Sequence, residues 1–457
     1  MRAGEPLRGG GRAFSRREAL LIGLGASASL LLAGCTPAGR PPATSAVIPP
    51  IGPRESVTLT YWSWLEGLQD VCDIWNARNP RVQVRTAWIP GGTVGGYSKL
   101  HAALAAGGGP DIAQIEMLNL PEFILQGSLV DLAQYGAHDV SDRYDQAIWS
   151  QVQFLDGVYG IPQDSGPVGF YYRADRLEAV GAEPPRTWDE WAQIAKAIRE
   201  DDADSYLECV PSADGTPFIS YCQQAGARWF EPQGDEWLVS MTDDATLSVA
   251  RFFDRAIDDD LVDTRFDVFS PAWFAAAADG RIAAATAASW ADRTIEGVRD
   301  GAGKWRVAPM QTWGDRGFGS SYLGGSTAAV MTSSAHPQEA FDFVTWMTTD
   351  PEAIDAQIEH CGIGWSTSRD HIGTSREKPS EFFSGQEYNR EVFLPAASEQ
   401  NTDWVWPPIM VRTLAMVADA FRAKLSAGVP LVDSIAAAER RTVQAFRDAG
   451  LDARRRS

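Results

Sequence analysis

The sequence predicts an α/β fold in which mostly parallel sheets are flanked by helices. Segments in which apolar and polar residues alternate, as at Val57, Leu59 and Tyr61, predict strands. They are separated by segments with apolar residues at helical spacing, and this alternation is typical of βαβ units with parallel strands. The length of 457 residues favours two or three domains.

Each element follows from its apolar spacing and from the residues that interrupt it. In the first part of the chain we expect strands at 57–61, 82–84 and 111–115, and helices that carry Leu68, Val71 and Trp75 and then Leu100 and Leu104. Further on we expect helices at 188–198, 241–260, 271–279, 338–348, 409–425 and 432–447, and a strand at 281–285. Thr187 and Glu190 form a capping-box pattern at the start of one helix. Residues 454–456 are expected in a solvated tail.

Composition excludes several classes of protein. With 44% hydrophobic and 22% charged residues, the chain is neither wholly disordered, nor collagen-like, nor a multi-span membrane protein. Its net charge of −20 opposes binding to phosphate backbones, so we expect no nucleic-acid partner. The 5 His residues are scattered and no metal-ligand spacing or nucleotide-binding motif is present, so we expect no metal and no cofactor.

The N-terminal segment has the plan of an export signal. A basic stretch that includes Arg16-Arg17 precedes an uncharged run at 19–33, which is too short to span a bilayer comfortably. The run ends at Leu-Ala-Gly-Cys, which resembles a bacterial lipobox with Cys35 as the lipidated residue. We therefore expect a signal peptide at 1–34 and a lipidated Cys with a flexible Pro-rich tether at 35–54. The pattern leaves the Sec and twin-arginine export routes both open.

Four further cysteines follow in the exported part. Cys209 and Cys222 lie on either side of a turn-like segment at 211–217 and are the candidate disulfide, since an extracytoplasmic location permits pairing. Cys72 lies on a helical apolar face, where a buried free thiol is expected, and Cys361 has no evident role.

Short segments in a fixed order along the chain resemble the substrate-binding lipoproteins of bacterial ABC sugar importers, the extracellular solute-binding family 1, which is maltose-binding-protein-like. They are LTYWSW at 59–64, YSKL at 97–100, GPDI at 109–112, QGSLVDL at 126–132, DGVYGIP at 156–162, YYRAD at 171–175, PRTWDE at 185–190, QAGARWF at 224–230 and Gly324-Gly325. Arg173 departs from the pattern, because the family often has Asn there.

The resemblance implies a two-lobed periplasmic-binding-protein-like fold with a ligand in a cleft between the lobes. The first lobe would comprise 55–163 and 326–370, and the second lobe 167–322 and 375–457. The chain would cross between the lobes near 163–166, near Gly324-Gly325 and near 371–374. Closure around a ligand would create the surface that a permease recognises.

Sugars need aromatic faces for their C–H groups and carboxylates or amides for their hydroxyls. On this ground, and on the loop positions that the resemblance implies, the candidate ligand residues are Trp64, Glu66, Glu116, Asp164, Trp229, Trp290, Gly324, Gly325, Trp365, Asp403 and Trp404. Each has a structural alternative: the tryptophans could pack in cores, the carboxylates could be solvated or could hold turns, and the glycines could serve only as hinges.

The function that follows from the resemblance is capture of a carbohydrate, from a monosaccharide to an oligosaccharide or a polyol, for delivery to the membrane subunits of an ABC permease. The protein would be a monomer, would not be an enzyme, and would be held at the outer face of the cytoplasmic membrane or in the periplasm through its lipid. Three alternatives remain open. They are a lipid-anchored glycoside hydrolase with two carboxylates, a binding protein for a cationic amine, and an adhesin or scaffold.

Overall fold

The computed structural model describes residues 47–92, 95–210 and 214–456. The predicted signal peptide, Cys35 and the part of the predicted tether before residue 47 lie outside the described residues. Within the described ranges, none of the helices is both long enough and apolar enough to cross a membrane.

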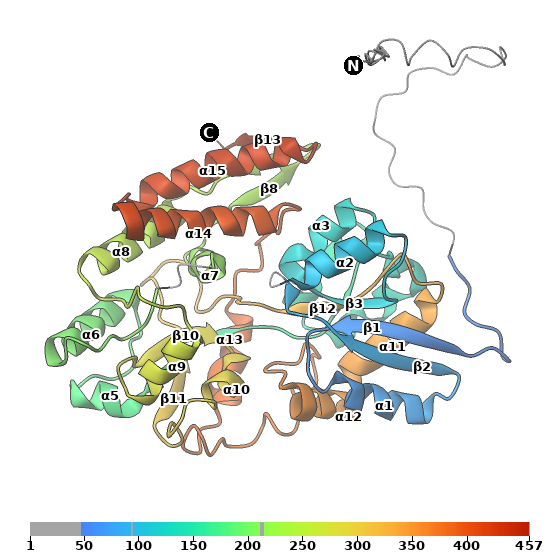
Figure 1. The fold of residues 1–457 in the computed structure, drawn as a ribbon, viewed down its shortest axis with the longest axis horizontal. Helices are drawn as coiled ribbons and strands as arrows, with labels where there is room; N and C mark the ends of the chain where they lie inside the picture. The colour runs from blue at the N-terminus through green and yellow to red at the C-terminus, as the bar shows by residue number, and fades with distance from the viewer. Residues whose placement is uncertain (1–46, 93–94, 211–213, 457) are drawn as a thin grey trace, which may run out of the picture. The chain divides into compact units, whose positions relative to one another are not determined.

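The first lobe is built on a five-stranded sheet with the strand order β2-β1-β3-β12-β6 (Figure 1). Its strands are β1 (Val57–Ser63), β2 (Val82–Trp88), β3 (Ile112–Glu116), β6 (Ile161–Pro162) and β12 (Ser326–Val330). The pairs β1–β2 and β1–β3 are parallel, as predicted, whereas β12 runs antiparallel to both β3 and β6. A strand from much later in the sequence therefore completes the sheet of the N-terminal part.

Helices cover this sheet, with α2 and α3 on one side in Figure 1 and α1 and α12 on the other. They are α1 (Leu68–Arg78), α2 (Gly96–Ala105), α3 (Leu120–Leu125), α4 (Gln146–Trp149), α11 (Pro337–Thr349) and α12 (Pro351–Ala356). In α1 the buried side chains Leu68, Val71, Cys72 and Trp75 have the spacing of one helical face. The core is aromatic, because Phe343 of α11 packs edge-on against Tyr61 and Trp75, with centroids 6.4 and 5.5 Å away.

Short elements complete the first lobe and its borders. They are the hairpin β4 (Gln153–Phe154) and β5 (Gly157–Val158), the 3₁₀ turns Met117–Asn119, Leu132–Tyr135 and Ala137–Arg143, and the π-helical turn Gln357–Cys361. A second π-helical turn, Asn389–Phe393, packs in the core of the second lobe.

The second lobe contains a three-stranded sheet in the order β10-β7-β11. Its strands are β7 (Val168–Arg173), β10 (Ala284–Ala288) and β11 (Trp305–Pro309), and both neighbours run antiparallel to β7. The expectation of a mostly parallel sheet is wrong for this lobe. Period-2 alternation identifies a strand but not its direction, which depends on the edge at which a distant segment enters the sheet.

A second small sheet in this lobe has the order β13-β9-β8, from β8 (Phe230–Gln233), β9 (Glu236–Val239) and β13 (Asp452–Arg455). Residues 454–456 are exposed, as expected, but the expectation of a free tail is wrong. β13 pairs in parallel with β9, and Arg454, Arg455 and Arg456 form ion pairs with Glu236, Glu439 and Glu231. The arginine run thus holds the C-terminal segment on an acidic surface.

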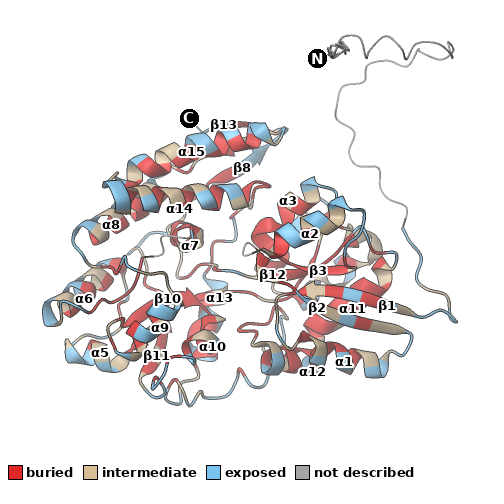
Figure 2. Ribbon diagram, in the orientation of Figure 1, coloured by how far each residue is buried: buried red, intermediate tan, exposed pale blue. Residues whose placement is uncertain are grey.

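The helices of the second lobe are α5 (Ala174–Ala179), α6 (Trp188–Asp201), α7 (Thr216–Gln224), α8 (Asp244–Asp258), α9 (Pro271–Ala278), α10 (Ala291–Ile295), α13 (Leu394–Ser398), α14 (Met410–Ala427) and α15 (Leu431–Asp448). The predicted helices agree with α6, α8, α9, α14 and α15 to within a few residues at each end. The Thr187 hydroxyl accepts the backbone N–H of Glu190 at 3.1 Å and caps α6, as the sequence pattern predicts. Figure 2 shows the inner faces of these helices buried and their outer faces exposed.

The disulfide predicted between Cys209 and Cys222 is wrong, because both side chains are free, buried thiols. They belong to different parts of the core, since Cys222 packs in the cluster around Trp188 and Cys209 in the cluster around Trp273. The turn-like residues between the two cysteines do not show into which part of the core each cysteine side chain points. Burial raises the pKa of both thiols well above the usual range.

The lobes are joined where three chain segments lie side by side. The Gln163 N–H donates to the Ser326 carbonyl at 2.9 Å, and the Ser165 N–H donates to the Trp365 carbonyl at 3.2 Å. A third bond joins the Leu323 N–H to the Gly166 carbonyl at 3.0 Å. The lobe boundaries at 55–163, 326–370, 167–322 and 375–457 stay a prediction.

A buried ion pair fixes the chain just after its last crossing. Thr374 still bonds to Asp355 on α12 of the first lobe, whereas the Arg376 guanidinium pairs with Asp292 on α10 of the second. Tyr388 donates its hydroxyl to the same carboxylate at 2.6 Å, and Arg376 also donates to the Ile363 carbonyl at 2.7 Å. Both charges are almost fully buried, so each depends on its partners.

We predict that Arg376→Met lowers the free energy of unfolding by about 3–5 kcal/mol, because it leaves the Asp292 charge buried and uncompensated. Adding Asp292→Asn should recover much of this loss. Urea denaturation followed by tryptophan fluorescence measures both. Arg390→Met, which removes an exposed pair with Glu387, is the matched control and should change stability by less than about 1 kcal/mol. Equal effects of Arg376→Met and Arg390→Met would contradict the prediction.

Candidate functional site

A cavity of about 260 Å³ lies where the crossings meet the ends of the strands. Six of the eleven predicted ligand residues line it, together with Leu65, Ser326, Gly362 and Ile363. These six are Trp64, Glu116, Asp164, Trp290, Gly324 and Gly325. We call this space the polar cavity.

The positions of these side chains follow from the topology. Trp64 comes directly after β1, Glu116 is the last residue of β3, and Asp164 follows β6. Side chains at the carboxyl ends of neighbouring parallel strands gather at one edge of a sheet. Trp290 comes from the second lobe, where it follows β10 and precedes α10. The cavity therefore takes residues from both lobes.

A buried hydrogen-bond chain holds Asp164 in place. The Ser63 hydroxyl donates to Gln114 at 2.6 Å, the Gln114 amide donates to Ser326 Oγ at 2.9 Å, and that hydroxyl donates to Asp164 Oδ1 at 2.7 Å. The Ser326 backbone N–H donates to the same oxygen. These bonds use Oδ1 and leave Oδ2 for a further donor. Burial raises the pKa of Asp164, and the bonds from Ser326 offset part of that shift.

Glu116 is held in a similar way. Its Oε2 accepts from the Tyr97 hydroxyl at 3.0 Å and from the Asn119 amide at 3.1 Å. The Tyr97 oxygen in turn accepts the Glu116 backbone N–H at 2.9 Å. Burial raises the pKa of Glu116, and the nearby Asp164 carboxylate adds to the shift. Tyr97, Asn119 and Ser326 were not among the predicted site residues. Tyr97 and Asn119 follow no strand on the cavity side, and Ser326 begins a strand that the sequence pattern did not predict.

Two partly exposed indoles complete the polar cavity. Trp64 meets the Tyr97 ring edge-on at 6.4 Å, and Trp290 meets Phe269 edge-on at 5.9 Å. The Trp290 Nε1–H donates to the Leu323 carbonyl at 2.9 Å, which fixes the ring beside the crossing. Gly324 has a φ of +83°, and a Cβ there would lie 3.1 Å from Trp290 Nε1, so only glycine suits this position. Two carboxylates and two indoles thus face one small space.

Two further cavities lie nearby, and the first of them shares wall residues with this one. A small space of about 20 Å³ also touches Gly324 and Gly325, and its lining includes Ser220 Oγ, Gln223 Nε2 and Tyr322 OH, none of which has a hydrogen-bond partner within the described ranges. It has room for one water or one ligand hydroxyl. It shares Gln151 and Trp406 with a third cavity of about 580 Å³. We call the three together the binding groove.

The other predicted ligand residues lie outside the polar cavity. Glu66 is exposed next to Leu65, and Trp365 is buried in the second-lobe core, although its carbonyl bonds to the crossing at Ser165. Asp403 and Trp404 line the third cavity, and Asp403 pairs with Arg228.

The prediction for Trp229 is wrong. Its side chain is fully buried, its Nε1–H donates to Thr246 Oγ1 at 2.7 Å, and its ring packs against Trp404 with centroids 5.7 Å apart. No face of this indole is left for a ligand.

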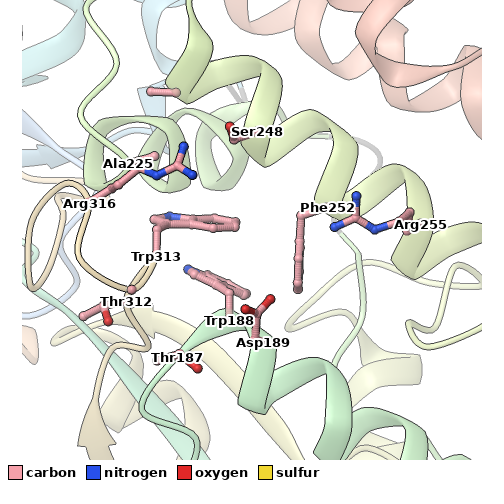
Figure 3. Close-up of a pocket in the computed structure, with 12 residues that line it drawn as sticks. Thr187, Trp188, Asp189, Ala225, Ser248, Phe252, Arg255, Thr312, Trp313 and Arg316 are labelled. Atoms are coloured by element: carbon pink, nitrogen blue, oxygen red, sulfur yellow. The ribbon is translucent and has the colours of Figure 1, made fainter.

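A separate pocket of about 290 Å³ lies wholly within the second lobe (Figure 3). Trp313 stacks on Trp188 with centroids 5.0 Å apart, Phe252 stands edge-on to Trp313, and Arg255 and Arg316 lie on either side. It shares no lining residue with the binding groove and contains none of the predicted ligand residues. No group of three or more His, Cys, Asp or Glu that could hold a metal ion occurs in the part of the chain that the structure describes.

Two α/β lobes joined by adjacent crossings, with a polar cavity lined from both, define a two-lobed binding protein. The model of the bacterial extracellular solute-binding protein family matches residues 61–354. The chain therefore belongs to this family and acts outside the cytoplasm.

The lactose-binding protein of Rhizobium radiobacter is 26% identical over 349 residues, which cover 72% of this chain and 79% of that protein. The arabinooligosaccharide-binding protein of Halalkalibacterium halodurans is 25% identical over 266 residues, or 56% of this chain and 58% of that protein.

Among solved structures, the galacto-N-biose/lacto-N-biose I-binding protein of an ABC transporter from Bifidobacterium longum superposes with a TM-score of 0.78 at 25% identity, over 87% of this chain and 99% of that one. The ABC transporter-associated binding protein of B. animalis subsp. lactis, in complex with β-1,6-galactobiose, gives 0.74 at 25% identity, over 88% of this chain and 100% of that one. The predicted two-lobed fold is confirmed.

The raised pKa of Asp164 predicts the pH dependence of stability without a ligand. The folded state holds the proton of the Asp164 carboxyl more tightly than the unfolded state does. The ionised carboxylate therefore destabilises the fold at pH 8. This destabilisation disappears as the pH falls through the raised pKa. Asp164→Asn keeps the acceptor oxygen for Ser326 and should therefore be the more stable protein at pH 8. The wild type should approach it toward pH 4 in thermal melts.

Asp419→Asn is the control of opposite sign. Arg422 lowers the pKa of Asp419, with help from Arg441, so this variant should be the less stable protein at pH 8. This difference should persist down to about pH 4 and shrink only below it, as the pH falls through the lowered pKa. A pH-independent difference for Asp164→Asn would contradict the assignment.

Proposed function

We propose that this protein is the substrate-binding subunit of an ABC importer, which captures a carbohydrate in the binding groove and delivers it to a membrane permease. One observation carries the proposal: two half-buried indoles and two half-buried carboxylates, each with an oxygen to spare, line one cavity between the lobes. Aromatic faces suit the C–H faces of a sugar, and the free carboxylate oxygens suit its hydroxyls.

We propose a disaccharide or a longer sugar as the ligand. The polar cavity has the scale of a single sugar ring, and a larger cavity of about 580 Å³ lined from both lobes offers space for further rings. The named relatives, which bind lactose, arabinooligosaccharides, lacto-N-biose and galactobiose, support this size class.

Binding without catalysis is part of the proposal. The relatives are binding proteins, and each carboxylate of the cavity has one oxygen bonded to neighbouring side chains, Glu116 to Tyr97 and Asn119 and Asp164 to Ser326. The raised pKa values of Glu116 and Asp164 follow from burial among strand ends and need no catalytic role. Contacts from both lobes give the ligand a higher affinity for the closed arrangement, which is what couples capture to delivery.

We also propose that Cys35 carries a lipid that holds the mature protein at the membrane surface, with residues 36–54 as the tether. The lipobox at 32–35 and the preceding apolar run support it.

The ligand experiment is a thermal-shift screen of residues 36–457 against sugars, polyols and cationic amines, followed by calorimetry and recovery of each ligand. A ligand at 100 times its Kd should stabilise the protein by about 2.7 kcal/mol. Trp64→Ala, Trp290→Ala and Glu116→Gln should each weaken a sugar by about 1–3 kcal/mol, which is roughly tenfold to hundredfold in Kd.

Trp88→Ala is the matched control, because Trp88 is a 58% exposed indole at the end of β2 that does not line the groove. It should leave Kd unchanged. Chemical conversion of the bound sugar would restore the hydrolase alternative, and a shift only with amines would replace the ligand class.

The lipid prediction is tested in a bacterial host fed labelled palmitate. The full chain should take up the label and fractionate with membranes, whereas Cys35→Ser should do neither. Label retained in Cys35→Ser would refute the assignment, and Cys72→Ser, a change at a buried free thiol, controls for loss of any cysteine.

A further inference from the structure

Phe269 has a backbone conformation that is unusual for a bulky residue. Its φ is +61°, in the left-handed region. The Ser270 N–H donates to the Asp267 carbonyl at 3.2 Å, so residues 267–270 form a turn with Phe269 at its third position. Only this third residue of the turn has a positive φ, and such a turn ordinarily has Gly or Asn there. A strained residue persists only where its surroundings fix it, so the contacts of the Phe269 ring have to be examined.

The position of Phe269 just before α9 would by itself suggest a local role. Ser270 caps this helix, because its hydroxyl accepts the Trp273 N–H at 3.2 Å. A hydrophobic residue before an N-cap often packs against the fourth helical residue, which here is Phe274. The ring contacts that the described residues give Phe269 are different, because its ring meets Trp273 edge-on at 5.0 Å and Trp290 edge-on at 5.9 Å. Phe269 therefore reaches beyond its own helix to an indole that lines the polar cavity.

Trp290 is also fixed at two other points. Its Nε1–H donates to the Leu323 carbonyl at 2.9 Å, and its backbone is so close to the neighbouring segment that a Cβ on Gly364 would lie 2.5 Å from the Trp290 nitrogen. The hydrogen bond restrains one atom of the indole. The contact with Phe269, at an angle of 69° between the ring planes, restrains the tilt of the whole ring.

We propose that Phe269 is a positioning residue, which holds the Trp290 indole in the orientation that lines the polar cavity before a sugar arrives. The inference rests on the proposed function and adds a residue that does not itself line the cavity. The strained turn at Phe269 places its ring against Trp290, and strained backbone is concentrated at sites of this kind. A pre-ordered indole removes an ordering cost from binding, so Phe269 raises the affinity through Trp290.

Phe274 offers a matched control. It is a second half-buried phenylalanine that meets Trp273 edge-on, at 5.3 Å, and in the described part of the chain it makes no ring contact with Trp290. Replacing either phenylalanine by leucine removes a ring from the surface of Trp273. Only the change at Phe269 also removes a ring from Trp290.

The first test needs no ligand. Residues 36–457 are labelled with 5-fluorotryptophan, and the fluorine NMR signal of Trp290 is assigned from its loss in Trp290→Phe. Phe269→Leu should broaden or split this signal, because the indole then samples more orientations, whereas Phe274→Leu should leave it single and sharp. Phe269→Tyr, which keeps the ring, should retain the sharp signal. Phe269→Gly, which suits the turn, should broaden it as Phe269→Leu does, because the ring and not the backbone is responsible.

A single sharp Trp290 signal in both Phe269→Leu and Phe269→Gly would overturn the inference. Because these two variants differ in their effect on the turn, a folding defect in Phe269→Leu leaves Phe269→Gly to decide the result.

The second test measures the affinities for lactose and β-1,6-galactobiose by calorimetry. Phe269→Leu should weaken binding by about three- to tenfold, and Phe274→Leu should leave it unchanged. In the Trp290→Ala background, Phe269→Leu should have no further effect, because the indole through which it acts is gone. An equal loss in both backgrounds would overturn the inference and leave the proposed function intact. If neither sugar binds, the proposed ligand class is contradicted for these sugars, and the ligand-free fluorine spectra decide the inference by themselves.

Discussion

The rest of the structure depends on the hydrogen-bonded contact between the chain crossings. Two of the crossing segments approach each other so closely that a Cβ on Gly166 would lie 2.2 Å from the Leu323 carbonyl oxygen. Asp164 Oδ1 accepts both the N–H and the hydroxyl of Ser326, the first residue of β12. That contact sets where β12 enters the first lobe and hence its register against β3, so the strand that completes one lobe is fixed by the connection to the other.

The same contact positions the binding site and explains why its carboxylates are partly desolvated. Asp164 uses one carboxylate oxygen to hold the crossing and presents the other to the polar cavity, so structure and recognition depend on the same buried charge. Glu116 is braced by Tyr97 and Asn119 in a comparable way. Raised pKa values show that both carboxylates are held at the expense of solvation, an arrangement expected where a binding site is organised before its ligand arrives.

Helix caps, helices and several strands are predictable from short segments of the sequence, whereas strand direction and the partners that enclose a side chain are not. Asp164 enters the predicted site through the chain crossing that the family resemblance implies. The cap at Thr187, the main helices, the first three strands and the meeting of Trp64 and Glu116 at one edge follow from spacing and from the position of strand ends. The direction of β10 and β11 does not, because an apolar strand pairs in either direction. Trp229 shows the same limit: one segment cannot reveal that Thr246 and Trp404 will enclose its indole.

On the proposed function, the groove also explains how binding could act on the lobes. A sugar in the polar cavity contacts Trp64 and Glu116 of the first lobe and Trp290 of the second at the same time. Its interaction free energy is therefore largest in the arrangement that brings these groups together, which is the condition for a ligand to shift a population.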